Sequence, residues 1–164
     1  KKINSFLIKS SSVKLPIKLD SSTKFSSISL KLNFLEYKNN ICSIPGIKHF
    51  LSRKIFTKST AKRLLEGKNL LNNKASGVIG YRNTGINTYS IRPIVYVRDT
   101  ETLYEESSCA SGTLALAYML YKEKGIKKLN VKQPSGFMLK TLITENEIKL
   151  SGPIVSIKKK TITI

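Results

Sequence analysis

A run of eight residues without a charge, LALAYMLY at 114–121, constrains the fold more than any other stretch of the chain. Lys122, Lys124 and Gly125 follow it, as expected for the last turn of a helix that ends at a left-handed glycine. We therefore predict a helix over 110–124. Because a helix that is apolar all round is buried on every side, the rest of the chain has to surround it.

The segments available to surround this helix alternate between apolar and polar residues with a period of two, as half-buried strands do. In the first third of the chain this pattern covers residues 13–19 and 28–34, and a short strand carrying His49 follows a turn at Pro45–Gly46. Two further strands, GVIGY and YSIRPIVYV, flank a turn at Asn83–Asn87. The remaining predicted strands lie at 129–133, 137–143, 148–157 and 160–164.

A second helix is predicted at residues 59–72, with Ser59 as its N-cap. Its apolar residues fall at helical spacing on one face, so this helix lies on the outside. These residues are Ala61, Leu64, Leu65 and Leu71. We expect an α+β fold in which an antiparallel β-barrel wraps around one central buried α-helix, with one outer amphipathic helix, and we expect residues 1–164 to form a single domain.

The formal charge of +19, from 29 Lys and Arg against 10 Asp and Glu, raises the question of a nucleic-acid partner. The basic residues are mostly lysines spread evenly along the chain, and no basic stripe alternates with aromatic residues. This distribution argues against nucleic-acid binding. No stretch is long and apolar enough to span a membrane, and no signal peptide is visible, so we expect a cytoplasmic protein.

Cys109 directly precedes the first turn of the predicted buried helix, where free backbone N–H groups and the helix dipole favour a negative charge. A thiol at such a position has a lowered pKa and becomes a better base or nucleophile. The next four residues, Ala110, Ser111, Gly112 and Thr113, are small and would let a substrate carboxylate approach the same N–H groups. The hydroxyls of Ser111 and Thr113 could add further donors.

Four of the ten carboxylates lie just before Cys109, which inverts the local charge of this basic chain. A carboxylate there could bind a substrate ammonium, and it would raise the thiol pKa against the effect of the dipole. A thiol balanced in this way could act as an acid or as a base near neutral pH. The alternative is structural, because a buried cysteine at a helix start is often only a small apolar residue. The four carboxylates are Asp99, Glu101, Glu105 and Glu106.

The segment YEESSCASGT with its apolar helix resembles the second active-site segment of the cofactor-independent amino-acid racemases of the diaminopimelate epimerase fold. It is most similar to the histidine racemases of opine-metallophore (staphylopine-type) biosynthesis. VKQPSGFMLKTLI resembles the strand–turn–strand that follows in this family, and ASGVIGYRN, SIRPIVYV and LSGPIVSI resemble its neighbouring strands. The continuous similarity covers residues 75–157.

The resemblance implies an isomerase of two similar domains, each an antiparallel barrel around a helix and each contributing one cysteine. One thiolate removes the proton from Cα and the other thiol delivers one to the opposite face, with no metal and no pyridoxal phosphate. Cys109 would be the acid–base residue of the second domain, residues 110–113 would bind the substrate carboxylate, and His49 would be a substrate-binding residue. Glu105 or Glu106 would be the acidic site residue, and we narrowly favour Glu105.

Only one such cysteine segment is present, because Cys42 does not lie at a comparable helix start. The chain is therefore expected to be the C-terminal half of a two-domain racemase, inactive without an N-terminal domain from the same or a separate chain. A homodimer is compatible with the sequence. Histidine or a similar amino acid is the expected substrate. A proline-type substrate remains open, and diaminopimelate epimerase is an alternative whose Arg-containing loop before the cysteine is absent here.

Two other functions remain open from the residues alone. Cys109 with His49 could form a thiol hydrolase or transferase, which substrate would label covalently. The chain could instead be an inactive binding module for a small anion or a nucleic acid.

Overall fold

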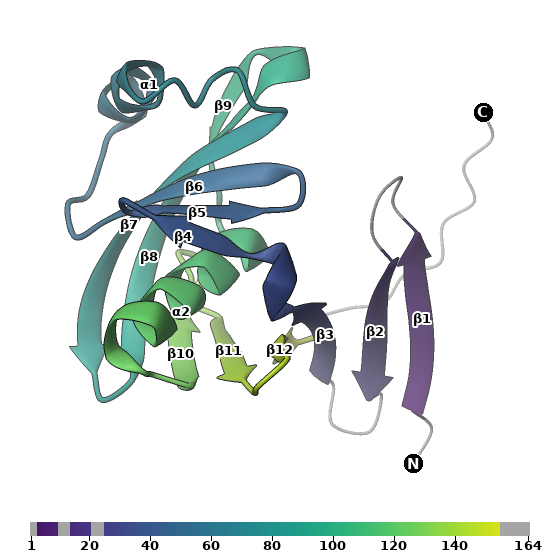
Figure 1. The fold of residues 1–164 in the computed structure, drawn as a ribbon. Coiled ribbons are helices and arrows are strands. Elements are labelled where there is room, and N and C mark those ends of the chain that lie inside the picture. Colours follow the sequence, from purple (N-terminus) through teal and green to yellow (C-terminus); the bar gives the residue numbers. More distant parts are fainter. Residues whose placement is uncertain (1–2, 10–13, 21–24, 155–164) are drawn as a thin grey trace.

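The computed structural model describes residues 3–9, 14–20 and 25–154, and its strands form one curled sheet with two helices (Figure 1). The helices are α1 (Lys58–Gly67) and α2 (Ala110–Lys124), with short 3-10 turns at Leu32–Phe34 and Arg98–Thr100. The strands are β1 (Ile3–Lys9), β2 (Lys14–Asp20), β3 (Phe25–Lys31), β4 (Glu36–Lys38), β5 (Ile41–Ile44), β6 (Ile47–Ser52), β7 (Ala75–Gly85), β8 (Thr88–Val97), β9 (Thr102–Glu105), β10 (Lys128–Lys132), β11 (Met138–Ile143) and β12 (Glu147–Pro153).

The sheet follows the order β1-β2-β3-β12-β11-β10-β8-β7-β6-β5-β4, and β9 pairs with β8 beyond the end of β10. The predicted antiparallel barrel is wrong in two respects. Among the described strands the order runs from β1 to β4 without closing, and the pairs β6–β7 and β8–β10 are parallel. Each parallel pair is joined through a helix, α1 or α2, because returning to the same strand direction needs a crossover connection.

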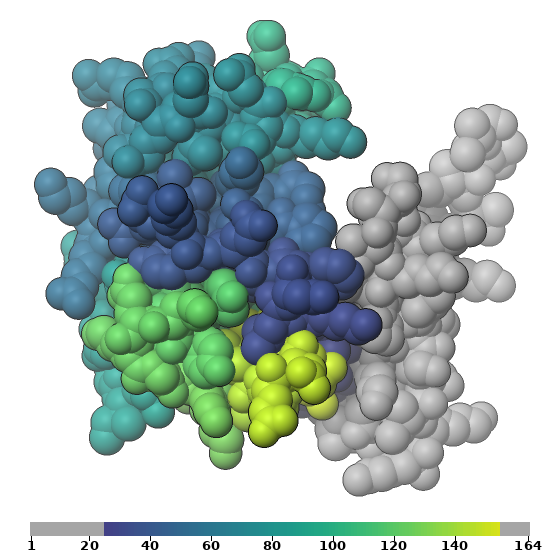
Figure 2. All heavy atoms as spheres, viewed as in Figure 1, coloured from purple at the N-terminus to yellow at the C-terminus, as the bar shows by residue number. Residues whose placement is uncertain are grey.

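Helix α2 has the predicted bounds and lies in the hollow of the curled sheet (Figure 1). Nine consecutive residues, from Gly112 to Leu120, are buried. They contact strands from both ends of the sheet, among them β5 and β6 on one side and β11 and β12 on the other. Gly125 ends the helix in the left-handed region with φ of 69°. In the space-filling view, the green segment that contains this end of α2 lies below the blue segment that contains β4 (Figure 2).

Helix α1 packs on the outer face of β7, β8 and β9, and its Ala61 and Leu65 are buried there with Val78 of β7. The next residue along β7, Ile79, belongs instead to the inner core around α2, because successive side chains of a strand point to opposite faces. The sheet thus separates two apolar clusters, of which the inner one surrounds the helix that begins at Cys109.

The bounds of α1 differ from the prediction. The helix begins one residue before Ser59 and is capped by Thr57, which exchanges side-chain hydrogen bonds with the backbone and hydroxyl of Thr60. It ends at Gly67 rather than at residue 72, because Asn69 adopts a left-handed conformation with φ of 58°. Leu70 and Leu71 extend the helical spacing in the sequence but pack from the following turn.

The predicted strands around residues 13–19, 28–34, 129–133, 137–143 and 148–157 correspond to β2, β3, β10, β11 and β12, with small differences in their ends. Residues 32–34 form a 3-10 turn instead of continuing β3. The predicted strand at 160–164 lies outside the described residues. In the part of the chain that the structure describes, neither helix is long and apolar enough to cross a membrane.

Candidate active site

Cys109 is the N-cap residue of α2, at the helix start where the sequence places it. Its backbone is extended, with φ of −131°, and its side chain turns back so that Sγ accepts a hydrogen bond from the Gly112 N–H at 3.2 Å. Cys109 is only 2% exposed. The sulfur therefore takes the capping place that a hydroxyl or carboxylate oxygen fills in most helices, where the helix N-terminus favours negative charge.

Gln133, in the turn between β10 and β11, holds this helix start in place. Its Oε1 accepts the Cys109 N–H at 2.9 Å, and its Nε2 donates to the hydroxyl of Thr113 at 3.0 Å. The Thr113 hydroxyl in turn donates to the Cys109 carbonyl at 2.8 Å. The Thr113 hydroxyl is thus occupied within the protein and is not the free donor that the sequence predicts. Gln133 lies in the VKQPSG stretch, and its side chain is buried. Nothing in the sequence indicates that this side chain contacts Cys109.

The two adjacent glutamates occupy different environments. Glu105, the last residue of β9, forms an ion pair with Arg92 at 2.5 Å and has an exposed side chain. Glu106 donates its backbone N–H to the Pro93 carbonyl at 3.0 Å, and its carboxylate raises the pKa of the Cys109 thiol. Glu106 thus acts on the cysteine electrostatically, whereas the carboxylate of Glu105 is held at the surface by Arg92.

His49 contacts the helix start through the side chain of Ser111. Its Nε2 is 2.9 Å from the Ser111 hydroxyl oxygen, which is 3.6 Å from the Cys109 sulfur. His49 is completely buried, and its Nδ1 has no hydrogen-bond partner among the described residues. Across the strand pair, a Cβ on Gly77 would lie 2.5 Å from this Nδ1, so only glycine leaves room for the ring. His49 does not contact the sulfur directly, as a Cys–His hydrolase pair would require.

The other residues of the predicted carboxylate site differ in their access to solvent. Ala110 is exposed and Ser111 is half-buried, and their N–H groups belong to the first helical turn, which lacks intrahelical acceptors. Gly112 is buried, and a Cβ there would lie 2.6 Å from Ile79 and 3.0 Å from the Cys109 sulfur. The glycine thus permits the close approach of backbone and sulfur, while Ala110 and Ser111 offer the open N–H groups.

The pKa of Cys109 is raised to about 12, chiefly by burial and also by the Glu106 carboxylate, against the lowering effect of the Ser111 hydroxyl and the Gly112 N–H. The expected lowering by the helix start is therefore outweighed by burial. Cys42 also has a pKa raised to about 12, by burial alone. The pKa of His49 is lowered to about 3 because its ring is buried, so the ring is neutral at pH 7. Cys109 is accordingly a protonated thiol in the unliganded protein.

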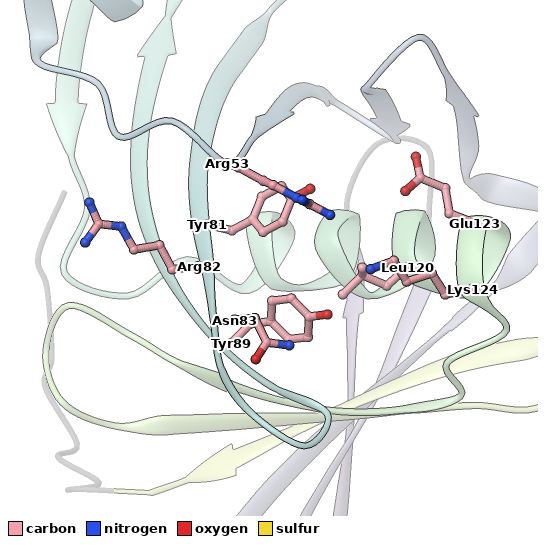
Figure 3. A pocket seen from close by; sticks show the side chains of 8 residues that line it. All are labelled: Arg53, Tyr81, Arg82, Asn83, Tyr89, Leu120, Glu123 and Lys124. Carbon is pink, nitrogen blue, oxygen red and sulfur yellow. The ribbon is translucent and has the colours of Figure 1, made fainter.

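A hollow of about 420 Å³ lies at the opposite end of α2 and does not include Cys109 (Figure 3). It is lined by Arg53, Tyr81, Arg82, Asn83, Tyr89, Leu120, Glu123 and Lys124. Within residues 3–9, 14–20 and 25–154, no three His, Cys, Asp or Glu side chains come together as metal ligands. Among the described residues, the group around Cys109 combines a titratable sulfur, a neighbouring carboxylate and open helix N–H groups.

The fold resembles that of two solved structures of PhzF-type proteins. It superposes on a putative phenazine biosynthesis PhzC/PhzF protein from Clostridium difficile strain 630 with a TM-score of 0.57 and 13% identity, covering 98% of this chain and 65% of that one. A PhzF-family protein from Enterococcus faecalis gives a TM-score of 0.54, again at 13% identity, over 91% of this chain and 61% of that one. At this identity the likeness concerns the fold alone.

The family follows from the sequence comparisons. A model described as the histidine racemase CntK N-terminal domain matches residues 2–158. Histidine racemases from two strains of Fusobacterium nucleatum subsp. nucleatum, ATCC 23726 and ATCC 25586, are 33% and 32% identical over 153 residues, which is 92% of this chain. The chain belongs to the histidine racemase family.

The same comparisons correct the expected place of the chain within the family. The matching model is that of the N-terminal domain, whereas the sequence was expected to be the C-terminal half. The chain spans about half the length of these relatives, 54% and 53%. These relatives therefore contain about as much sequence again outside the stretch that they share with this chain.

Proposed function

We propose that this chain supplies one of the two acid–base thiols of a cofactor-independent amino-acid racemase that acts on histidine or a similar amino acid. The observation that carries the proposal is the position of the Cys109 sulfur. It caps a buried helix, where the Gly112 N–H and the Ser111 hydroxyl lie within hydrogen-bond distance and the Glu106 carboxylate raises the thiol pKa. A group that gives up and takes back one proton needs neighbours that favour each of its two protonation states.

In the proposed reaction, the protonated Cys109 delivers its proton to one face of Cα while the thiolate of a second cysteine removes the Cα proton from the other face. One S–H bond and one C–H bond are broken, and one S–H bond and one C–H bond are formed, so no electrons are gained or lost. The thiolate then left on Cys109 is stabilised by the Gly112 N–H and the Ser111 hydroxyl. In the reverse direction this thiolate is the base.

The substrate carboxylate would be bound by the N–H groups of Ala110 and Ser111 at the exposed part of the helix start. Glu106, which raises the pKa of the thiol, is the better candidate for the acidic site residue than Glu105, whose carboxylate is engaged by Arg92. The N–H of Gly112 is already directed at the sulfur, and the hydroxyl of Thr113 is bound to the Cys109 carbonyl, so these two residues shape the helix start.

The second thiol would come from the C-terminal domain that the family relatives contain beyond the length matched here. Two thiols on opposite faces of Cα require that the substrate lie between two helix starts. On this basis the exposed region around Ala110 would face the second domain.

The test uses the protein expressed from its complete reading frame, under reducing conditions in D2O. L-histidine, L-proline and diaminopimelate are offered separately, and proton NMR follows loss of the Cα–H signal. We expect loss of the signal with L-histidine together with formation of the D-enantiomer. Exchange with diaminopimelate but not with histidine would contradict the proposed substrate, and no exchange with any of the three would contradict the proposed activity.

A further inference from the structure

The ring of His49 is held in a small closed space. Ser111 of α2 lies at Nε2, Gly77 of β7 lies against Nδ1, and Cys42 of β5 is the residue directly opposite on the neighbouring strand. The titratable groups that face this cluster are Cys109, Cys42 and, through its effect on the Cys109 thiol, Glu106. Because the ring is fully buried and neutral at pH 7, it carries a single N–H.

The position of that N–H follows from the available partners. A proton on Nδ1 would leave a buried donor without an acceptor, which is rare and costly in proteins, because Nδ1 has no partner among the described residues. A proton on Nε2 is donated to the Ser111 oxygen at 2.9 Å and leaves only an acceptor unpaired. The Nε2–H tautomer is therefore the one that the surroundings favour.

This tautomer determines the direction of the next hydrogen bond. Once the Ser111 oxygen accepts from His49, its own proton is free to be donated, and the Cys109 sulfur lies 3.6 Å away. With the other tautomer the hydroxyl proton would be donated to Nε2, and the sulfur would lose this donor. The histidine thus decides whether Ser111 is a donor to the cysteine.

We propose that His49 is a positioning residue, which fixes the Ser111 hydroxyl as a donor to Cys109 and so stabilises the thiolate state of that cysteine. This inference rests on the proposed function only for the use of the Cys109 thiolate in catalysis. The hydrogen-bond direction can be tested on the chain without any substrate, so its failure is distinguishable from failure of the racemase proposal. It also gives His49 a different role from the substrate contact expected from the sequence.

The first test is the tautomer of His49, which is the single histidine of the chain and needs no resonance assignment in an untagged sample. Long-range proton–nitrogen NMR of the nitrogen-15-labelled chain at pH 7 distinguishes the two neutral tautomers. We expect the Nε2–H form. An Nδ1–H form, or a charged ring, would overturn the proposal.

The second test measures alkylation of Cys109 by iodoacetamide at pH 8, read by mass spectrometry on the peptide that carries it. Ser111→Ala should slow the reaction about fivefold, as expected for the loss of one hydrogen bond to the sulfur. His49→Leu should slow the alkylation to a similar extent. His49→Gln should largely retain the original rate, because an amide N–H can donate to Ser111. In the Ser111→Ala background, His49→Leu should have no further effect.

If His49→Leu slowed the alkylation equally in the Ser111→Ala background, the proposed coupling would be contradicted. An unchanged alkylation rate in His49→Leu alone would contradict it as well. Cys42, buried beside the histidine, reports folding in the same experiment, because it stays protected only in a folded chain. If a variant exposes Cys42, that variant is set aside and the tautomer of the unmodified chain decides.

Discussion

At the scale of single residues, the adjacent carboxylates of Glu106 and Glu105 differ, because Glu106 raises the pKa of the Cys109 thiol and Glu105 pairs with the Arg92 guanidinium. The charge and hydrogen bond of Glu106 raise the Cys109 pKa, so Glu106→Gln should lower this pKa and speed Cys109 alkylation at pH 8, on the order of tenfold for one pKa unit. Glu105→Gln is the matched control and should leave the rate unchanged. Equal effects of the two substitutions would contradict the assignment of Glu106 to the thiol.

A second prediction at this scale concerns Gly77, whose hydrogen atom faces the His49 ring. The methyl group of Gly77→Ala would come within 2.5 Å of Nδ1, so we expect a loss of about 1–3 kcal/mol in the free energy of unfolding. Gly67→Ala, at the end of α1 with open space around it, should be neutral or stabilising by up to about 1 kcal/mol. Urea unfolding of both variants checks the pair, and equal stability would show that the ring can move aside.

The sequence predicts the position of Cys109 because a cysteine followed by small residues and an apolar run marks a helix start locally. It leaves Glu105 and Glu106 undecided, because their difference depends on where β9 ends and on the neighbouring Arg92. It also gives no role to Gln133, which contacts Cys109 across 24 residues of sequence. Hydrogen bonds between distant segments leave no periodic pattern to read.

At the scale of elements, the start of α1 offers a direct test. Thr57 and Thr60 form a reciprocal capping box, so Thr57→Ala should cost about 1 kcal/mol of stability. Ser59→Ala removes a similar hydroxyl from the first helical turn, the one that the sequence suggests as the cap, and should change stability by less than about 0.5 kcal/mol. Thermal unfolding of the two variants distinguishes them, and a larger loss for Ser59→Ala would contradict the observed cap.

The bounds of α2 are predictable because the apolar run, the basic last turn and Gly125 all act within the helix. Strand pairing is less accessible to sequence reasoning. The alternating pattern identifies most strands, but it does not say that α1 and α2 are crossovers that make β6–β7 and β8–β10 parallel. Those partners are set by the packing of helices on the two faces of the sheet.

At the scale of the whole molecule, the sequence leads to the right family but to the wrong half of it. The two-thiol proposal supplies a physical reason, because under it two similar domains each present a cysteine at a buried helix start and so share the same local requirements. A motif defined by those requirements therefore identifies the kind of domain and not its place in the chain.

One prediction follows from the two-thiol proposal at this scale. Residues 1–164 alone contain Cys109 but no second cysteine at a comparable helix start, since Cys42 lies within β5. The isolated chain should therefore give no D-histidine from L-histidine, as measured by chiral chromatography over a day. Racemisation by the isolated chain would show that one thiol is sufficient, or that two copies of the chain combine.

The most direct test of the central claim, that Cys109 moves the Cα proton, compares two cysteine substitutions in the protein from the complete reading frame. Cys109→Ala and Cys42→Ala each remove one buried thiol with a raised pKa, but only Cys109 lies at the helix start beside Glu106. Proton NMR in D2O then follows the Cα–H signal of L-histidine. We predict that Cys109→Ala abolishes the exchange, with a loss of at least about a thousandfold, and that Cys42→Ala retains it. Exchange at an undiminished rate in Cys109→Ala would contradict the account.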